Sequence, residues 1–172
     1  IYRTYSEELC EKMRILVQHA TVITPNLTEA LLLLDGEQGM KEKMELFSQM
    51  DETQQLKETE KSGRELADRF GLKSIVITGV DVVCGDGSVK MGNLVIEENE
   101  ADWYFSIKEG GSYSGTGDLF ASVLSAGMVK GISMKECVQK AIAFLARAIH
   151  DAVLEGTDRN DGVCFEKYLK ML

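Results

Sequence analysis

The sequence predicts an α/β fold in which a mainly parallel sheet is flanked by helices and carries an antiparallel hairpin at one edge. Two patterns support this prediction. Short runs of β-branched residues alternate with longer helical patterns, an order typical of parallel strands joined by helices. The dipeptide Asp86-Gly87 lies between two apolar runs, as in a tight hairpin turn. The 172 residues, 44% of them hydrophobic, are enough to bury the core of one domain spanning residues 1–172.

Local signals place each element along the chain. Ser6 and the acidic residues after it open a helix, and Pro25 stops the short strand that follows. Gly36 and Gly71 end the next two helical stretches, and Ser133 begins a capping box ahead of a long helix. In chain order, the predicted elements are a helix from residue 6, a strand at 21–23, a helix up to about residue 36, a partly helical stretch at 39–71, strands at 74–78, 80–84, 89–96 and 103–107, and helices at 118–129, 133–154 and 165–172.

The composition excludes several classes of partner. The chain carries 28 acidic and 19 basic side chains and has no basic stripe that could bind nucleic acid. No apolar run reaches the length of a membrane span, so we expect no membrane partner. The four cysteines lack CxxC spacing, so we expect reduced thiols and a cytoplasmic protein rather than a zinc or disulfide site. A small phosphorylated ligand remains compatible with this composition.

A glycine-rich segment, residues 110–117, precedes the apolar helix predicted from about Asp118. Glycines let the backbone turn so that successive N–H groups point at one anion, and the helix N-terminus adds partial positive charge. A carboxylate at that position can accept the proton of an attacking hydroxyl while the N–H groups stabilise a transferred phosphoryl group. The alternative is that Asp118 only caps the helix.

A second polar segment, residues 24–29, follows the short strand. Asn26 and Glu29 are three residues apart and can face the same side at the start of a helix. Their oxygens suit Mg²⁺, bound directly or through its waters. The alternative is a capping box, with Asn26 as the cap and Glu29 at the third helical position.

A third segment, Thr78-Gly79, ends the strand predicted at 74–78 and could bring a hydroxyl close to a nucleotide phosphate or ribose. The alternative is a simple strand-to-loop turn. All three segments follow predicted strands. Because α/β folds bind ligands at the edge where the carboxyl ends of parallel strands meet, we expect the three segments to converge on one site.

Together these segments resemble the ribokinase-like superfamily of small-molecule kinases, and specifically the pyridoxal (pyridoxamine) kinases. The resemblance is carried by residues 23–30, 77–79 and 114–121 and covers essentially the whole chain. It implies a fold whose amino-terminal part is missing here, because such kinases are longer. The presence of Ile1 in place of Met at the start agrees with that expectation. The chain would then be the carboxyl-terminal, nucleotide-side portion of such a kinase.

The resemblance implies roles for the glycine-rich segment and the strand before it. Asp118 is the expected catalytic base, acting on the 5′-hydroxymethyl group of a vitamin B6 compound. Gly115, Thr116 and Gly117 are expected to form the anion hole around the γ-phosphate of ATP. The strand at 103–107 is expected to line the base or ribose.

The resemblance also implies roles for the other two segments. Asn26 and Glu29, with Thr24 nearby, are expected to organise Mg²⁺ and phosphate. Thr78 is expected to touch the nucleotide. Some relatives carry a second hydroxyl residue where this chain has Gly79. The side-chain contact with phosphate that such a residue makes is therefore not expected at position 79.

Several alternatives stay open at this point. Hydroxymethylpyrimidine kinases share the Thr-Pro-Asn segment but often carry Cys at the position of Asp118, which favours the pyridoxal branch. Sugar kinases of the same superfamily are a further alternative. The resemblance implies a homodimer for the full-length protein and an inactive isolated chain. An alternative of another class is a truncated, non-catalytic module that binds nucleotide or assembles with a partner.

Overall fold

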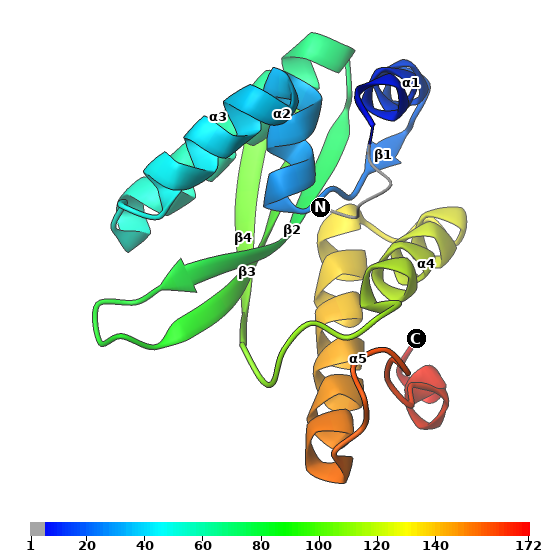
Figure 1. Ribbon diagram of the computed structural model, residues 1–172. Coiled ribbons are helices and arrows are strands. Elements are labelled where there is room, and N and C mark those ends of the chain that lie inside the picture. The colour runs from blue at the N-terminus through cyan, green and yellow to red at the C-terminus, as the bar shows by residue number, and fades with distance from the viewer. Residues whose placement is uncertain (1–5) are drawn as a thin grey trace. The chain divides into compact units, whose positions relative to one another are not determined.

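The computed structural model describes residues 6–172 (Figure 1); Ile1 lies outside the described residues. The chain divides into two compact units, one that runs to Trp103 and one from Tyr104 to Leu172, and each is described by itself. The organisation as a single domain stays a prediction. The elements are α1 (Glu7–Val17), β1 (Val22–Ile23), α2 (Leu27–Phe47), α3 (Glu52–Phe70), β2 (Ser74–Val83), β3 (Val89–Glu97), β4 (Glu100–Ile107), α4 (Thr116–Val129), α5 (Met134–Glu155) and the 3-10 helix η1 (Glu166–Met171).

The four strands form one sheet in the order β1-β2-β3-β4, and this sheet is mostly antiparallel. β1 pairs with β2 in parallel, whereas β2 pairs with β3 in antiparallel fashion. The prediction of a mainly parallel sheet is therefore wrong. The physical reason is the length of the connections, because a parallel crossover needs a dozen or more residues. The β2–β3 connection has five residues, 84–88, and the β3–β4 connection has two, 98 and 99.

The predicted hairpin turn is confirmed, but the strand before it is longer than expected. Residues 74–83 form one strand, β2, where the sequence predicted two. The register against β3 shifts between Ile77 and Val80, which marks a β-bulge at Thr78 and Gly79. Gly79 has a φ of +63°, a conformation that glycine adopts without strain. The bulge therefore lets the strand continue through the predicted turn.

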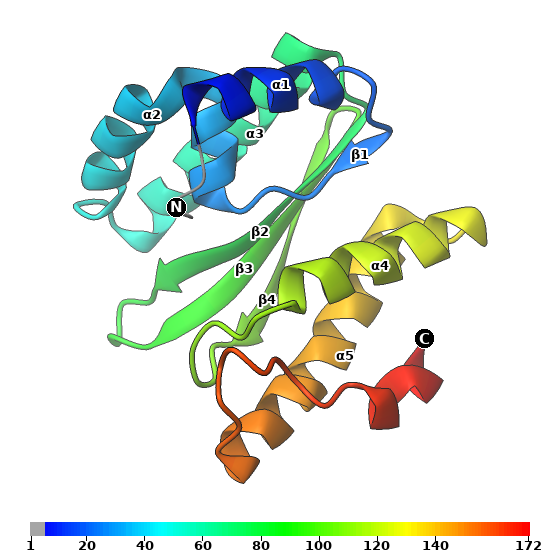
Figure 2. The same ribbon diagram turned by 45° about the vertical axis from the view of Figure 1, so that its right-hand side comes forward.

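Two helices pack on the sheet in the first unit (Figure 2). α3 contacts β2 and β3, and α2 contacts α3 and β2. Gly63 permits the close approach of α3, since a Cβ on it would lie 2.5 Å from Cδ1 of Ile96 and 3.1 Å from Cδ1 of Ile77. The fully buried core of this unit is aliphatic and includes Leu66, Ile75, Ile77 and Leu94.

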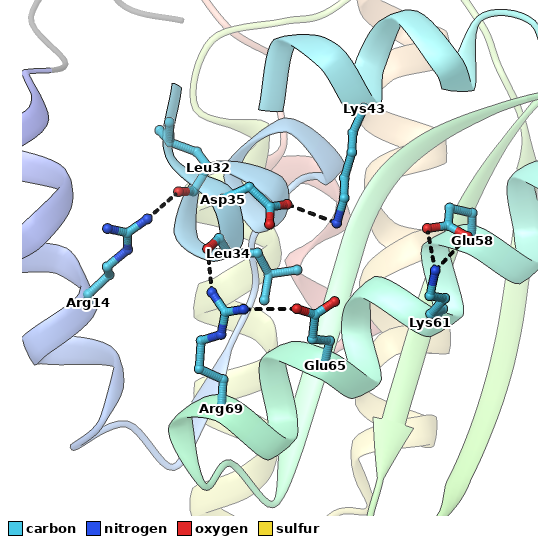
Figure 3. A network of polar contacts seen from close by, with 9 residues as sticks. All are labelled: Arg14, Leu32, Leu34, Asp35, Lys43, Glu58, Lys61, Glu65 and Arg69. Atoms are coloured by element: carbon cyan, nitrogen blue, oxygen red, sulfur yellow. Dashed lines mark hydrogen bonds and ion pairs between the residues drawn. The ribbon is translucent and has the colours of Figure 1, made fainter. Parts of the chain in front are cut away.

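A kink divides α2 at Gly36, whose φ is +71°. The sequence predicted the end of a helix near Gly36, and the structure resumes the helix beyond this glycine as far as Phe47. Arginines from both neighbouring helices cap carbonyl groups of residues 32–34 ahead of the kink (Figure 3). Arg14 donates to two of these carbonyls, at 2.8 and 3.1 Å, and Arg69 donates to the third. The interrupted helix thus keeps its carbonyl partners.

In the second unit, α4 packs against α5, and η1 packs on α5. The helices α4 and α5 approach closely at Gly127, where a Cβ would lie 2.3 Å from Sγ of Cys137. The rings of Phe144 and Phe165 meet edge to face at 6.4 Å. Within residues 6–172, none of the helices combines the length and the apolar character that a bilayer span requires.

Candidate functional site

The first group of predicted residues lies at the start of α2. The Glu29 N–H donates to Oδ1 of Asn26, and the Asn26 N–H donates to Oε2 of Glu29, both at 2.9 Å. This is the capping box that the sequence analysis left open as an alternative. The second carboxylate oxygen of Glu29, Oε1, has no partner in the part of the chain that the structure describes. The role of Asn26 and Glu29 toward Mg²⁺ stays a prediction.

Thr78 lies directly beside this capping box. It forms an isolated parallel bridge with Asn26, and its N–H donates to the carbonyl of Pro25 at 2.9 Å. The structure therefore brings together three of the predicted residues of the first unit, Asn26, Glu29 and Thr78. Thr24 follows the end of β1 and is partly buried. The expected contacts of these four residues with nucleotide or metal stay predictions.

Asn93 supports the bulge at Thr78 and Gly79, and sequence reasoning missed it. Its side chain is 4% exposed, and its Oδ1 accepts a hydrogen bond from the Gly79 N–H at 3.3 Å. A bulge frees a backbone donor from the strand ladder, and Asn93 provides the acceptor. The available signal was an amide residue inside the apolar run of β3, where a polar side chain needs a partner.

The second group lies at the start of α4, where Gly115 is the N-cap residue with a φ of +80°. Among residues 6–172, no side chain caps this helix, although Ser6, Asn26, Asp51 and Ser133 each cap another of the five α-helices in that part of the chain. The helix begins at Thr116, two residues before the predicted start. The N–H groups of its first turn therefore point out of the helix without a side-chain acceptor. This end of α4 carries the partial positive charge of a helix N-terminus.

Among residues 6–172, the space beside Gly115 and Gly117 is open, and Asp118 is exposed. A Cβ on Gly115 or Gly117 would meet no atom within 4 Å. Asp118 is the third residue of α4, and its carboxylate has no partner among residues 6–172. Thr116 Oγ1 donates to the carbonyl of Tyr113 at 2.9 Å, which braces the turn. Open backbone donors beside a free carboxylate suit an anion whose reaction partner loses a proton.

Few carboxylates lie in the predicted segments. Within the described residues, no cluster of three or more His, Cys, Asp or Glu side chains could hold a metal ion. Mg²⁺ in phosphoryl-transfer enzymes is bound through one or two carboxylates together with substrate phosphates. The carboxylates of Glu29 and Asp118 are the ones present in the predicted segments, each within its own unit.

Comparison with known proteins agrees with this chemistry. Residues 2–162 match the family of phosphomethylpyrimidine kinase. No curated protein sequence matches the chain. One similar solved structure, from Bacteroides thetaiotaomicron, is assigned as a phosphomethylpyrimidine kinase and contains pyridoxal. It has 28% identity and a TM-score of 0.80, over 99% of this chain and 55% of that chain.

Two further similar structures are pyridoxal kinases. The enzyme from Lactobacillus plantarum has 25% identity and a TM-score of 0.71, over 99% of this chain and 55% of that one. The enzyme from Bacillus subtilis, solved as an ADP complex, has 25% identity and a TM-score of 0.61, over 85% and 50%. The chain spans about half the length of the solved structures it matches. The resemblance drawn from the sequence is confirmed at this level. The chain belongs to the phosphomethylpyrimidine kinase family, and its structural relatives include pyridoxal kinases.

Proposed function

We propose that this chain forms the nucleotide-side part of an ATP-dependent kinase that phosphorylates the 5′-hydroxymethyl group of pyridoxal, pyridoxamine or pyridoxine. The observation that supports the proposal most directly is the start of α4, which within residues 6–172 has no side-chain cap, open space beside Gly115 and a free carboxylate at Asp118. Family membership makes phosphoryl transfer to an alcohol the natural use of this arrangement.

In the proposed reaction, the chain's own residues bind, orient and accept a proton. Backbone N–H groups of Gly115, Thr116 and Gly117 donate to phosphoryl oxygens and stabilise the negative charge that develops on them. A carboxylate oxygen of Asp118 accepts the proton of the substrate hydroxyl. When bound, ATP would supply the phosphoryl group and leave as ADP, and Mg²⁺ would neutralise part of the phosphate charge.

The residues of the first unit hold the nucleotide and its cation in this proposal. Glu29 offers its free oxygen Oε1 to Mg²⁺ or to a water that Mg²⁺ carries. Asn26, Thr24 and Thr78 offer amide and hydroxyl groups to the phosphates. The capping box does not compete with this role, because it uses the other oxygen of Glu29.

Hydroxymethylpyrimidine is a second candidate substrate, and the family match favours it. The Bacteroides relative was solved with pyridoxal, which favours a B6 compound. Because the chain spans about half of its relatives, we expect the isolated chain to bind nucleotide without measurable turnover. The proposal includes a homodimer for the active form.

A substrate panel tests the proposal. Phosphate transfer from radiolabelled ATP is measured for pyridoxal, pyridoxamine, pyridoxine, hydroxymethylpyrimidine and ribose, with the 172-residue chain and with any longer natural form of the protein. We expect Mg²⁺·ATP to bind both forms, and B6 compounds to be the best acceptors. Binding without transfer to any acceptor in every form would support a non-catalytic nucleotide-binding module instead. A chain that binds no nucleotide would contradict both functions.

A further inference from the structure

Arg159 lies beside the glycine-rich segment, in the loop at residues 157–163 that follows α5. Its carbonyl accepts a hydrogen bond from the Ser114 N–H at 2.9 Å, one residue before the N-cap of α4. Gly162 lies on the same loop with a φ of +81°, and a Cβ on it would be 3.0 Å from the carbonyl oxygen of Ser114. Figure 2 shows this loop running beside the segment that leads into α4. The backbone therefore fixes the start of the Arg159 side chain next to the predicted anion site.

The guanidinium group of Arg159 packs directly on Gly111. A Cβ on Gly111 would lie 2.4 Å from Cζ, 2.5 Å from Nη1 and 2.7 Å from Nη2 of Arg159. Gly111 does not have a positive φ, so its backbone conformation does not itself require glycine. The guanidinium of Arg159 fills the space that a Cβ would take, and as the end of a flexible, exposed side chain it would move aside for a larger residue. Gly111 therefore leaves room for the guanidinium of Arg159 on the glycine-rich segment.

The charge of Arg159 is not neutralised by its surroundings. Arg159 is the single basic residue in the two segments 110–118 and 157–163. Its guanidinium has no ion pair and donates to no side chain within residues 6–172. Oδ1 of the neighbouring Asp158 instead accepts from Asn160, at 2.8 Å from the backbone N and 3.0 Å from Nδ2. Among residues 6–172, this chain with a net charge of −9 thus keeps one exposed, unpaired guanidinium on Gly111, four residues before the N-cap of α4.

We propose that Arg159 is a nucleotide-binding residue whose charge attracts and orients the phosphate chain at the glycine-rich segment. This inference rests on the proposed function, which assigns the start of α4 to ATP. A guanidinium presents N–H donors in a planar fork that matches two phosphate oxygens. The ligand class is a nucleoside polyphosphate, and the effect of Arg159 increases with the number of its phosphates.

Binding of ATP, ADP, AMP and adenosine to the 172-residue chain tests the inference by titration calorimetry. For Arg159→Ala, we expect the affinity for ATP to fall about 10-fold, the affinity for AMP to fall less, and any adenosine binding to stay unchanged. Arg159→Lys should recover part of the ATP affinity, since it keeps the charge and loses the fork. Gly111→Ala should reproduce the ATP effect by displacing the guanidinium, and the double variant should lose no more than Arg159→Ala alone.

Arg147→Ala is the matched control, because it removes an exposed arginine of α5 in the same unit and should leave all four affinities within about twofold. Melting temperatures establish that each variant is folded. An equal loss for all four ligands would overturn the inference, since it would show a structural role. An unchanged ATP affinity in Arg159→Ala would also overturn it. Absence of ATP binding by the unaltered chain would overturn the proposed function together with this inference.

Discussion

The starts of α2 and α4 carry similar residues and use them in opposite ways. At α2, Asn26 and Glu29 close a capping box at 2.9 Å on both sides, so the helix satisfies its own first donors. At α4, the cap position is Gly115, no side chain of the described residues replaces the missing cap, and the acidic third residue, Asp118, is exposed. A cap commonly stabilises a protein by about 1 kcal/mol. The chain forgoes that stabilisation at α4, where the donors stay available to a ligand.

Replacement of Asp118 tests the comparison with the largest expected effect. In the longest natural form of the protein that turns over, Asp118→Asn should lower kcat by about 10²- to 10⁴-fold, because the substrate hydroxyl loses its proton acceptor. ATP affinity should stay equal or increase, since a negative charge beside the phosphates is removed. Steady-state kinetics and titration calorimetry measure the two quantities. Glu136→Gln, at the third position of the capped helix α5, is the control, and kcat near normal in Asp118→Asn would exclude the catalytic assignment.

Replacement of Asn93 tests whether the bulge beside the α2 cap depends on its buried acceptor. Asn93→Ala leaves the Gly79 N–H without its partner and should lower the free energy of unfolding by about 1–3 kcal/mol. Urea unfolding of the chain measures this loss. Asn99→Ala, in an exposed turn, is the control and should change stability by less than about 0.5 kcal/mol. Equal stability of the two variants would show that Asn93 does not hold the bulge.

Two substitutions of Asn26 separate capping from ligand binding at α2. Asn26→Ala should destabilise the chain by about 1 kcal/mol, whereas Asn26→Ser should keep nearly full stability because serine is an equally good cap. Thermal unfolding measures both. If Asn26 also contacts phosphate or Mg²⁺, the stable Asn26→Ser variant should bind Mg²⁺·ATP more weakly. Unchanged binding of Mg²⁺·ATP by Asn26→Ser would show that Asn26 only caps the helix.

The smallest effect is expected where η1 docks on α5, far from either helix start in sequence. Asp151 Oδ2 accepts hydrogen bonds from Lys167 Nζ at 2.5 Å and from the Tyr168 hydroxyl at 2.6 Å. These hydrogen bonds lower the pKa of Asp151 below its ordinary 3.8. A lowered carboxyl pKa contributes stability above the unfolded value, and this is lost as the pH falls through the folded value. Unfolding at pH 6 and pH 3 should therefore show an acid-dependent loss that is smaller in Asp151→Asn. The same loss in both proteins would exclude Asp151 as its source.

Local signals in the sequence correctly located two helix caps and one turn. The capping box of Asn26 and Glu29, the hairpin at Asp86-Gly87 and the cap at Ser133 each depend on residues within four positions of one another. Such contacts form wherever the local backbone permits. The candidate segments around residues 26, 78 and 118 could be identified for the same reason.

Strand direction and the supports of the site required the tertiary structure. The alternation of strand and helix predicted a mainly parallel sheet, but the short connections after β2 and β3 make it mostly antiparallel. Asn93 and Arg159 were not predicted, because their partners Gly79 and Gly111 lie far from them in the sequence. A helix start is decided within one turn of backbone, so the sequence by itself offered Asn26 as the cap of α2. It left open whether Asp118 caps α4, and the structure places Gly115 at that cap position. Only the tertiary structure decided which side chains from distant segments contact Gly79 and Gly111, since such contacts depend on how the chain packs.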